Sequence, residues 1–405
     1  MKTICVLAAG VGAAAFGATL YAAAPAKAPP PIANYWMDVA TTSGFGAGMA
    51  GGGQPDMGQI MQMMNGGGGA VGHTVDLRLA SKTKAPPSPQ ADHWIPASLQ
   101  MGPSLPLVTP VRVPPEPRSD GLPQNFQRPQ GRMLIYWGCG EHVSAGQPTV
   151  IDFAKVAAGQ MPPALKAMAA MGNAVSGPHS APGFGRWPND HDSRAVPAAG
   201  SLLGAHRVAG NYSPEIGFSL AAGQDFMPGL GLMEAGSLAS GASRLRWQPA
   251  AQATGYALAM FGSGQDGDVV MWSSAKAAGM PVLDYLAPAE VKRLVTAGNV
   301  LPPSTNECVL PAEVAAAVPM GMITMIGYGP EVNFAETPKA PKWTAKVRYK
   351  STASVMRGMG AMMGGMDGAG QAMPPQDQRQ PRKKKRSLLG DIIQGATGMP
   401  LPEDQ

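Results

Sequence analysis

One apolar segment occurs twice in this chain and constrains its fold more than any other feature. Each copy opens with glycine, continues through six mostly apolar residues and closes with Gly-x-Gly, at residues 131–141 and 255–265. A further apolar run follows each copy, at residues 149–153 and 268–272. Short apolar runs bounded by glycine are typical of β-strands, so each copy predicts a β-hairpin. Recurrence of the whole pattern indicates two related domains.

Composition supports a mainly β fold. The chain has 405 residues, enough for two ordinary domains, and contains 53 Gly and 41 Pro. Glycine costs conformational entropy in a helix and proline removes a helical hydrogen bond, so this composition favours short strands and turns. We therefore predict a mainly β protein with two related small β-sandwich-like domains, Gly/Met/Pro-rich linkers and a few short helices. The expected helices lie at residues 164–171, 288–297 and 311–317.

The sequence divides into six segments. These are a signal peptide (1–28), a Gly/Met-rich N-terminal segment (29–72), a first β domain (73–160), a helix and loop linker (161–205), a second β domain (206–350) and a low-complexity, disordered basic tail (351–405). The glycine-rich part of the N-terminal segment contains too little apolar surface to offset its ordering entropy, which predicts a linker. The run at residues 32–38 within it is an edge strand or a docking anchor.

Alternating apolar residues predict further strands. These strands lie at residues 74–79, 99–107, 216–220, 322–326 and 343–349. The prolines of 99–107 cannot donate in a β-ladder, so we expect an edge strand there. We expect the strand at 322–326 to end at Gly327 and the one at 343–349 to be the last strand of the fold.

A short segment in the second half resembles a known family of β modules. Residues 245–247 end in Trp247, residues 256–258 begin with Tyr256, and a connection containing Pro, Ala and Gly joins them. We expect these two strands to pair. The arrangement resembles fibronectin type III and related sandwich modules over residues 245–272. The resemblance implies a β-sandwich whose core the aromatic side chains fill, and it carries no functional residues.

The beginning of the chain has the pattern of an export signal. Lys2 precedes an apolar stretch at residues 4–23, and Ala24 and Ala26 supply an A-x-A cleavage pattern. A retained membrane anchor is the alternative, which the weak hydrophobicity of this Ala- and Gly-rich stretch disfavours. We therefore expect a cleaved signal peptide and a periplasmic or secreted protein.

Export changes the cysteine count. Loss of Cys5 with the signal peptide leaves Cys139 and Cys308, an even number in an oxidising compartment. A disulfide between them is one outcome and two free thiols are the other, because sequence cannot show whether their Cα atoms come within bonding reach.

Positive charge is concentrated near the C-terminus. The chain carries a net charge of +5, yet residues 339–386 alone carry +10, so the remainder is acidic. Within the tail, a basic run adjoins four aliphatic residues that share a helical face. These residues are Arg382, Lys383, Lys384, Lys385 and Arg386, followed by Leu388, Leu389, Ile392 and Ile393. Such a cluster suits docking on an anionic membrane surface or an acidic partner. The alternative is a solvated tail, and no specific nucleic-acid binding is expected.

Neither glycine turn indicates nucleotide binding or catalysis. Residues 262–267 match G-x-G-x-x-G, but a strand is expected after them, so no helix N-terminus would face a pyrophosphate. Cys139, Glu141 and His142 combine a thiol with a base. In the second copy, however, Ser263 takes the place of the cysteine, which indicates a position that requires only a small residue. We therefore predict no enzyme active site and no cofactor.

Two kinds of metal ligand occur without a recognised spacing. Residues 190–192 are Asp-His-Asp, with His179 and His206 nearby in sequence, and they offer oxygen and nitrogen ligands. Methionine clusters offer soft thioether ligands for Cu(I). They comprise Met57, Met61, Met63, Met64, Met356, Met359, Met362, Met363 and Met366. The alternatives are solvated loop residues and plain low complexity.

The sequence as a whole favours a non-enzymatic, exported envelope protein that binds or scaffolds through its β domains. The alternative is a periplasmic copper-binding protein that uses the methionine clusters or the His/Asp loop. The binding partner, the physiological role and the oligomeric state stay open at this point.

Overall fold

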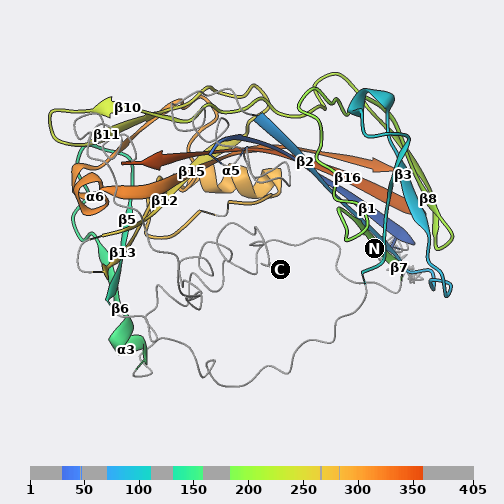
Figure 1. Ribbon diagram of the computed structural model, residues 1–405, viewed down its shortest axis with the longest axis horizontal. Helices are drawn as coiled ribbons and strands as arrows, with labels where there is room; N and C mark the ends of the chain where they lie inside the picture. Colours follow the sequence, from blue (N-terminus) through green and yellow to red (C-terminus); the bar gives the residue numbers. More distant parts are fainter. Residues whose placement is uncertain are drawn as a thin grey trace, which may run out of the picture.

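The computed structural model describes residues 30–45, 47, 71–110, 131–157, 183–264, 267–281 and 283–358 (Figure 1). Within these ranges the protein is mainly β with a few short helices, as predicted. None of the helices in this part of the chain is long and apolar enough to cross a membrane.

The described strands and helices follow one another in a mainly β order. The strands are β1 (Ala33–Gly44), β2 (Val71–Ser81), β3 (Ala91–Trp94), β4 (Ser104–Pro106), β5 (Arg132–Trp137), β6 (Thr149–Asp152), β7 (Gly183–Trp187), β8 (Gly204–Gly210), β9 (Ser213–Leu220), β10 (Met233–Ser237), β11 (Ser243–Arg246), β12 (Gly255–Ser263), β13 (Val269–Ser273), β14 (Glu307–Leu310), β15 (Met320–Ala335) and β16 (Trp343–Arg357). The helices are α3 (Phe153–Ala157), α5 (Pro288–Thr296), α6 (Ala312–Ala317) and the short 3-10 helix η1 (Ala97–Leu99).

The largest sheet has nine strands in the order β6-β5-β13-β12-β15-β16-β1-β2-β7. The antiparallel pair β15 and β16 is the longest, with 16 and 15 residues. β1 runs parallel to β16 on one side and antiparallel to β2 on the other. Because side chains alternate across a strand, Tyr35, Met37 and Val39 of β1 face the core together.

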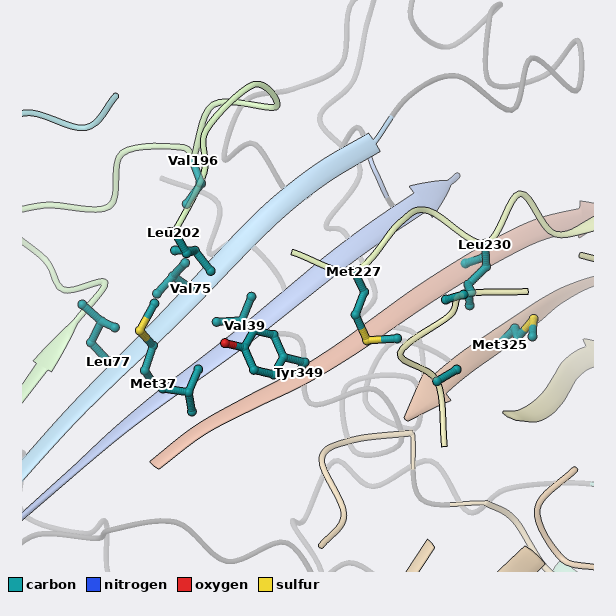
Figure 2. Close-up of a cluster of buried hydrophobic side chains, with 14 of the residues drawn as sticks. Met37, Val39, Val75, Leu77, Val196, Leu202, Met227, Leu230, Met325 and Tyr349 are labelled. Carbon is teal, nitrogen blue, oxygen red and sulfur yellow. The ribbon is translucent and has the colours of Figure 1, made fainter. Parts of the chain in front are cut away.

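Two smaller sheets pack against this core. The sheet β4-β3-β8-β9 lies near one end of β15 and β16, and the sheet β10-β11-β14 lies near the other (Figure 1). The four-stranded sheet meets the large one where Phe218 contacts Phe334, with ring centroids 5.1 Å apart. Figure 2 shows the region between the small sheets, where residues 196–202 and 227–230 place side chains over β1, β2, β15 and β16.

The opposite face of the nine-stranded sheet carries helix α5. Its buried Val291 packs with Ala257 of β12 and with Ile326 and Tyr328 of β15. Pro288 at the start of α5 is tolerated because the first helical N–H groups have no partner within the helix. The helix leaves the β1, β2 and β16 part of this face to polar side chains, which are described in the next section.

The two predicted hairpins are present but lie in one sheet. β5 pairs antiparallel with β6, and β12 pairs antiparallel with β13. β5 also pairs with β13, so the hairpins are neighbours. The four-stranded sheet likewise combines β3 from the predicted first domain with β9 from the second. Residues 73–160 and 206–350 therefore share their sheets, and the division into two separate β domains does not describe this molecule.

Three of the predicted non-domain segments contribute strands. β1 lies in the N-terminal segment 29–72, β7 lies in the linker 161–205, and β16 extends into the tail segment as far as Arg357. β1 is central rather than an edge strand, since it pairs on both sides. Its parallel partner lies about three hundred residues away, where Tyr35 is opposite Ala345. A local sequence pattern cannot show a pairing between such distant residues, which explains the interpretation of residues 32–38 as an edge strand or a docking anchor.

Gly327 does not end a strand, because β15 continues through it to Ala335. The nearby Gly329 is required by close packing instead. A Cβ atom there would lie 2.6 Å from both the Tyr349 carbonyl oxygen and the Met227 sulfur. The Gly-Tyr-Gly sequence thus marks a close approach of neighbouring chain, and its interpretation as a strand end was wrong.

The expected pairing of residues 245–247 with 256–258 is also wrong. β11 pairs with β10 and β14, whereas β12 pairs with β13 and β15. Trp247 and Tyr256 nevertheless pack together in the core, with ring centroids 5.6 Å apart. The resemblance to fibronectin type III modules stays a prediction. The helix expected at 164–171 lies outside the described residues.

Candidate functional site

The most concentrated group of charged side chains surrounds Asp38 on β1. Asp38 is 2% exposed and accepts a hydrogen bond from the Arg348 Nε atom at 2.6 Å and another from the Arg348 Nη2 atom. The register places Asp38 directly opposite Arg348 on the parallel strand β16. Arg78 of β2 donates to the same carboxylate from the other side and also pairs with Asp76 at 2.9 Å. One buried carboxylate therefore joins three adjacent strands.

Two aromatic rings flank this network. The Arg348 guanidinium carbon lies 4.5 Å from the centroid of the Trp36 ring and 4.6 Å from that of Tyr285. Lys346 Nζ lies 5.0 Å from the Trp36 centroid, and Lys350 Nζ lies 4.3 Å from the Tyr285 centroid. Cations over aromatic faces are attracted by the ring quadrupole, more strongly where water is excluded. The stacking holds Tyr285, which precedes α5, against the sheet.

Two further ion pairs extend the network along the sheet. Lys350 Nζ lies 2.8 Å from Asp284 Oδ1, and Lys346 Nζ lies 2.7 Å from Glu331 Oε1. We call the whole set the charged face. It comprises Trp36, Asp38, Asp76, Arg78, Asp284, Tyr285, Glu331, Lys346, Arg348 and Lys350. Four carboxylates balance four cations in it, so the charged face holds little net charge of its own.

The pKa values of the groups in the charged face are set by two opposing effects, burial and ion pairing. Burial alone would lower the pKa of Arg348, but hydrogen bonding to Asp38 and nearby negative charge raise it above its ordinary value. Burial would raise the pKa of Asp284, but Lys350, the Tyr285 N–H and Arg348 together more than offset this and lower it. Burial raises the pKa of Asp76, and Arg78 offsets only part of the shift. Burial and the Asp38 charge raise the pKa of Tyr285 well above its usual range.

This geometry suits recognition by contact. Every carboxylate of the charged face is ion-paired, and the pairs fix both the strands and the segment carrying Tyr285. Trp, Tyr and Arg are the residue types enriched in protein binding surfaces. The charged face therefore holds part-exposed groups such as Trp36 and Lys346 in place around a buried Asp38–Arg348 centre.

A second polar cluster lies on the opposite, core side of β1. The Tyr35 hydroxyl lies 2.8 Å from His93 Nδ1, and His93 Nε2 lies 2.9 Å from His206 Nδ1. His206 Nε2 lies 2.7 Å from the Leu202 carbonyl oxygen. Tyr35 and His93 are fully buried and His206 is 2% exposed. We call this series of hydrogen bonds the Tyr–His chain.

The turn after β5 is fastened to β14 and α6. Cys139 is joined to Cys308 by a disulfide, with Cα atoms 5.3 Å apart. Gly140 N–H donates to the Val309 carbonyl at 2.9 Å, and His142 Nδ1 lies 3.0 Å from a Glu313 oxygen. The sulfur considered as a nucleophile is thus bonded, and the contacts join the nine-stranded sheet to the three-stranded sheet.

The His/Asp loop does not gather as a ligand set. Asp192 binds Arg194, with Oδ2 2.8 Å from Nη2, which lowers the pKa of Asp192 through hydrogen bonding. His191 is exposed, whereas His206 is buried in the Tyr–His chain. His179 lies outside the described residues. Among the described residues, no group of three or more His, Cys, Asp and Glu could hold a metal ion.

Two further predicted sites lie outside the described part of the chain. One is the basic tail cluster, Arg382, Lys383, Lys384, Lys385, Arg386, Leu388, Leu389, Ile392 and Ile393. The other is the pair of methionine clusters, of which only Met356, in β16, is described.

Sequence reasoning missed both polar clusters. A usable signal was present for the charged face, because Lys346, Arg348 and Lys350 alternate along a predicted strand and must share one side of it. The Tyr–His chain offered no such signal, since His93 lies on a four-residue strand in a proline-rich region.

The comparisons with known proteins do not place this chain in a family. No protein-family model, curated protein or solved structure matches it.

Proposed function

We propose that this chain is an exported, non-enzymatic envelope protein that binds a polar partner and acts as a scaffold. The observation that carries the proposal is the charged face. Most of its aromatic and charged side chains lie on strands of one sheet, and ion pairing and stacking hold Asp284 and Tyr285, which precede α5, against that sheet. Preorganised groups lose little entropy on binding, so such a surface favours recognition.

The cysteines support export. A disulfide that closes 169 residues of chain persists in an oxidising compartment and is rare where glutathione keeps thiols reduced. The apolar beginning of the sequence and its A-x-A pattern point the same way. The basic cluster at 382–386 would then add attraction to an anionic envelope surface.

Intact-mass analysis tests export. Protein recovered from the envelope fraction should begin near residue 27 and should resist alkylation of Cys139 and Cys308 before reduction. A chain that retains Met1, or two cysteines alkylated under denaturing, non-reducing conditions, would refute this part of the proposal.

Binding by the charged face is tested with a charge-balanced double variant. Lys346→Gln with Glu331→Gln removes one ion pair and leaves the net charge unchanged. The matched control is Arg293→Gln with Glu290→Gln, which removes an ion pair of 2.6 Å from the exposed surface of α5. We expect the first variant, but not the second, to lose several-fold in co-sedimentation with isolated envelope fractions. Equal binding by all three proteins would exclude the charged face as the binding surface.

The tail is tested separately. Deletion of residues 382–393 should weaken binding to anionic vesicles at low salt, where the charges of the basic run are least screened. Binding to neutral vesicles should stay unchanged, because their surface carries no charge that attracts the basic run. Equal sedimentation of both proteins with anionic vesicles would assign the tail no docking role.

A further inference from the structure

The hydrogen bonds of the Tyr–His chain have a fixed direction. The Leu202 carbonyl can only accept, so His206 Nε2 carries a proton and donates to it across 2.7 Å. Neutral His206 then offers Nδ1 as an acceptor to His93 Nε2–H at 2.9 Å. Neutral His93 in turn offers Nδ1 as an acceptor to the Tyr35 hydroxyl at 2.8 Å. With both imidazoles neutral, every ring nitrogen is satisfied.

The surroundings of the two imidazoles are apolar and aromatic. The Phe218 ring of β9 stacks on His206 at 5.0 Å with an angle of 3° between the planes. Phe334 of β15 packs behind Phe218, and Tyr35 is the group that β1 presents to the pair. Burial lowers the pKa of His206 and lowers that of His93 well below its ordinary value.

Most charged groups near the Tyr–His chain lie on other surfaces. Asp225 is nearer, and its Oδ1 atom accepts from the Leu202 N–H at 2.9 Å. Asp38 and Asp76 affect the pKa of Tyr35, but their side chains are on the opposite face of the nine-stranded sheet. Asp92 neighbours His93 in sequence and pairs with Ser104, while Arg207 neighbours His206 and stacks over Trp94 at 3.9 Å. Both point away from the imidazoles, because side chains alternate along a strand. No carboxylate of the described residues contacts either ring to stabilise a positive charge.

Protonation is incompatible with this arrangement in two stages. One added proton at His206 Nδ1 requires His93 to change tautomer and to donate to the Tyr35 oxygen. The Tyr35 hydroxyl proton then loses its acceptor, and a charge is buried without a partner. A second proton leaves two N–H groups facing each other across the 2.9 Å between the rings, with like charges on both.

We propose that the Tyr–His chain is an acid-sensitive latch between the nine-stranded sheet and the four-stranded sheet. Tyr35 belongs to β1 of the large sheet, whereas His93 and His206 belong to β3 and β8 of the small one. Opening this interface lets water and buffer solvate the imidazolium groups. Acid therefore favours the state in which the two sheets are separated.

The direction of the pH dependence follows from proton linkage. The open state has histidine pKa values near about 6.5, and the closed state has lower ones. Below roughly pH 6.5 the open state binds more protons, so the closed state is lost as pH falls and is fully favoured above that value. Each proton taken up on opening changes the opening equilibrium about tenfold per pH unit, and two protons change it about a hundredfold.

Hydrogen exchange measured by mass spectrometry on the full chain tests the latch. Between neutral pH and roughly pH 5, after correction for the intrinsic exchange rate, amides of β3, β8 and β9 should lose at least tenfold in protection. Amides of β12 and β15 should keep theirs. An equal loss of protection in both sheets, or unchanged protection of the β8 amides, would overturn the proposal from the unaltered protein alone.

Single substitutions then test whether the acid response of hydrogen exchange comes from the Tyr–His chain. His206→Gln retains one donor and one acceptor but removes the titration, so the acid response of β8 should fall about tenfold per pH unit relative to the unaltered protein. His191→Gln is the exposed control. His73→Gln is the stricter control. Burial also lowers the pKa of His73, but this residue stacks on Phe226 and does not belong to the Tyr–His chain. A response abolished by His73→Gln and retained in His206→Gln would show that the latch is elsewhere and refute the proposal.

Discussion

Two polar clusters lie on opposite sides of one strand and tolerate burial by different chemistry. Asp38 faces outward from β1 into a network of full charges, while Tyr35 faces inward to two neutral imidazoles. The outward cluster balances each carboxylate with a cation. The inward cluster avoids charge altogether and satisfies its polar atoms by the choice of tautomer. A strand of alternating side chains thus carries two polar networks with opposite requirements for protons.

The difference determines when each cluster fails. Ion pairs such as Lys346–Glu331 lower the pKa of the carboxylate, so they stabilise the fold above the unfolded pKa of about 4.3 and lose this contribution as pH falls through the lower folded value. The imidazole pair loses its contribution earlier, below about pH 6.5. Between those two pH values the Lys346–Glu331 pair keeps its contribution, while protonation destabilises the Tyr–His chain. Asp76 is the exception on the outward face, because burial raises its pKa and its protonation removes a charge that the fold disfavours. The comparison therefore predicts that mild acid weakens the inward side of β1 before the ion pairs of the outward side.

The largest effect is expected from Asp38→Asn. The change leaves Arg348, which is 7% exposed, without its ion-pair partner and removes one of the two carboxylates that pair with Arg78, the other being Asp76. Breaking a buried ion pair by removing one member costs about 3–5 kcal/mol. Urea unfolding at neutral pH measures this loss in the free energy of unfolding.

The control for that change is Asp76→Asn on the neighbouring strand. Asp76 also contacts Arg78, but 44% of its side chain is exposed, so we expect less than about 1 kcal/mol. A small cost for Asp38→Asn, similar to that of Asp76→Asn, would mean that the outward cluster is not organised around the buried carboxylate.

An intermediate effect is expected from Tyr35→Phe on the inward side. The substitution keeps the ring and removes the hydroxyl that donates to His93 Nδ1, leaving a fully buried acceptor without its donor. An unsatisfied buried polar atom costs about 1–3 kcal/mol. Tyr349→Phe is the matched control, because that hydroxyl donates to the Gln224 carbonyl at a part-buried site and should cost less. Equal unfolding midpoints for the Tyr35 variant and the unaltered protein would show that this hydrogen bond does not contribute to the stability of the fold.

The predictability of these clusters from sequence differs for a physical reason. The alternation in residues 343–349 correctly predicts β16, and with it the shared side of Lys346 and Arg348. Their partner Asp38 could not be identified, because β1 pairs with β16 across most of the chain and in parallel register. Local patterns specify which residues share a face of a strand. They do not specify which strand comes next in the sheet.

The same limit explains the other errors and successes. Helix α5 was predicted to within one residue, because a proline start and a glycine stop are local signals. The two hairpins were also predicted, but their union in one sheet requires β5 to pair with β13, a contact between distant segments. The inward Tyr–His chain needs three strands from two sheets to meet, so no single window of sequence contains it.

The smallest effect is expected from Asp284→Asn, and it distinguishes exposed from buried pairing within the outward cluster. Asp284 lies 2.8 Å from Lys350 Nζ, but 41% of its side chain is exposed. Water screens such a pair, so its loss should cost less than about 1 kcal/mol. Burial would raise the pKa of Asp284, and its pairing with Lys350 contributes to lowering it overall.

The Asp284–Lys350 pair therefore stabilises the fold above the unfolded pKa of about 3.9 and loses this contribution as pH falls through the lower folded value. Urea unfolding should show a cost at neutral pH that shrinks with added salt and vanishes in strong acid. Asp38→Asn should lose far less of its cost to salt, because Asp38 is only 2% exposed. Identical salt dependence for the two variants would mean that burial does not separate the centre of the charged face from its edge.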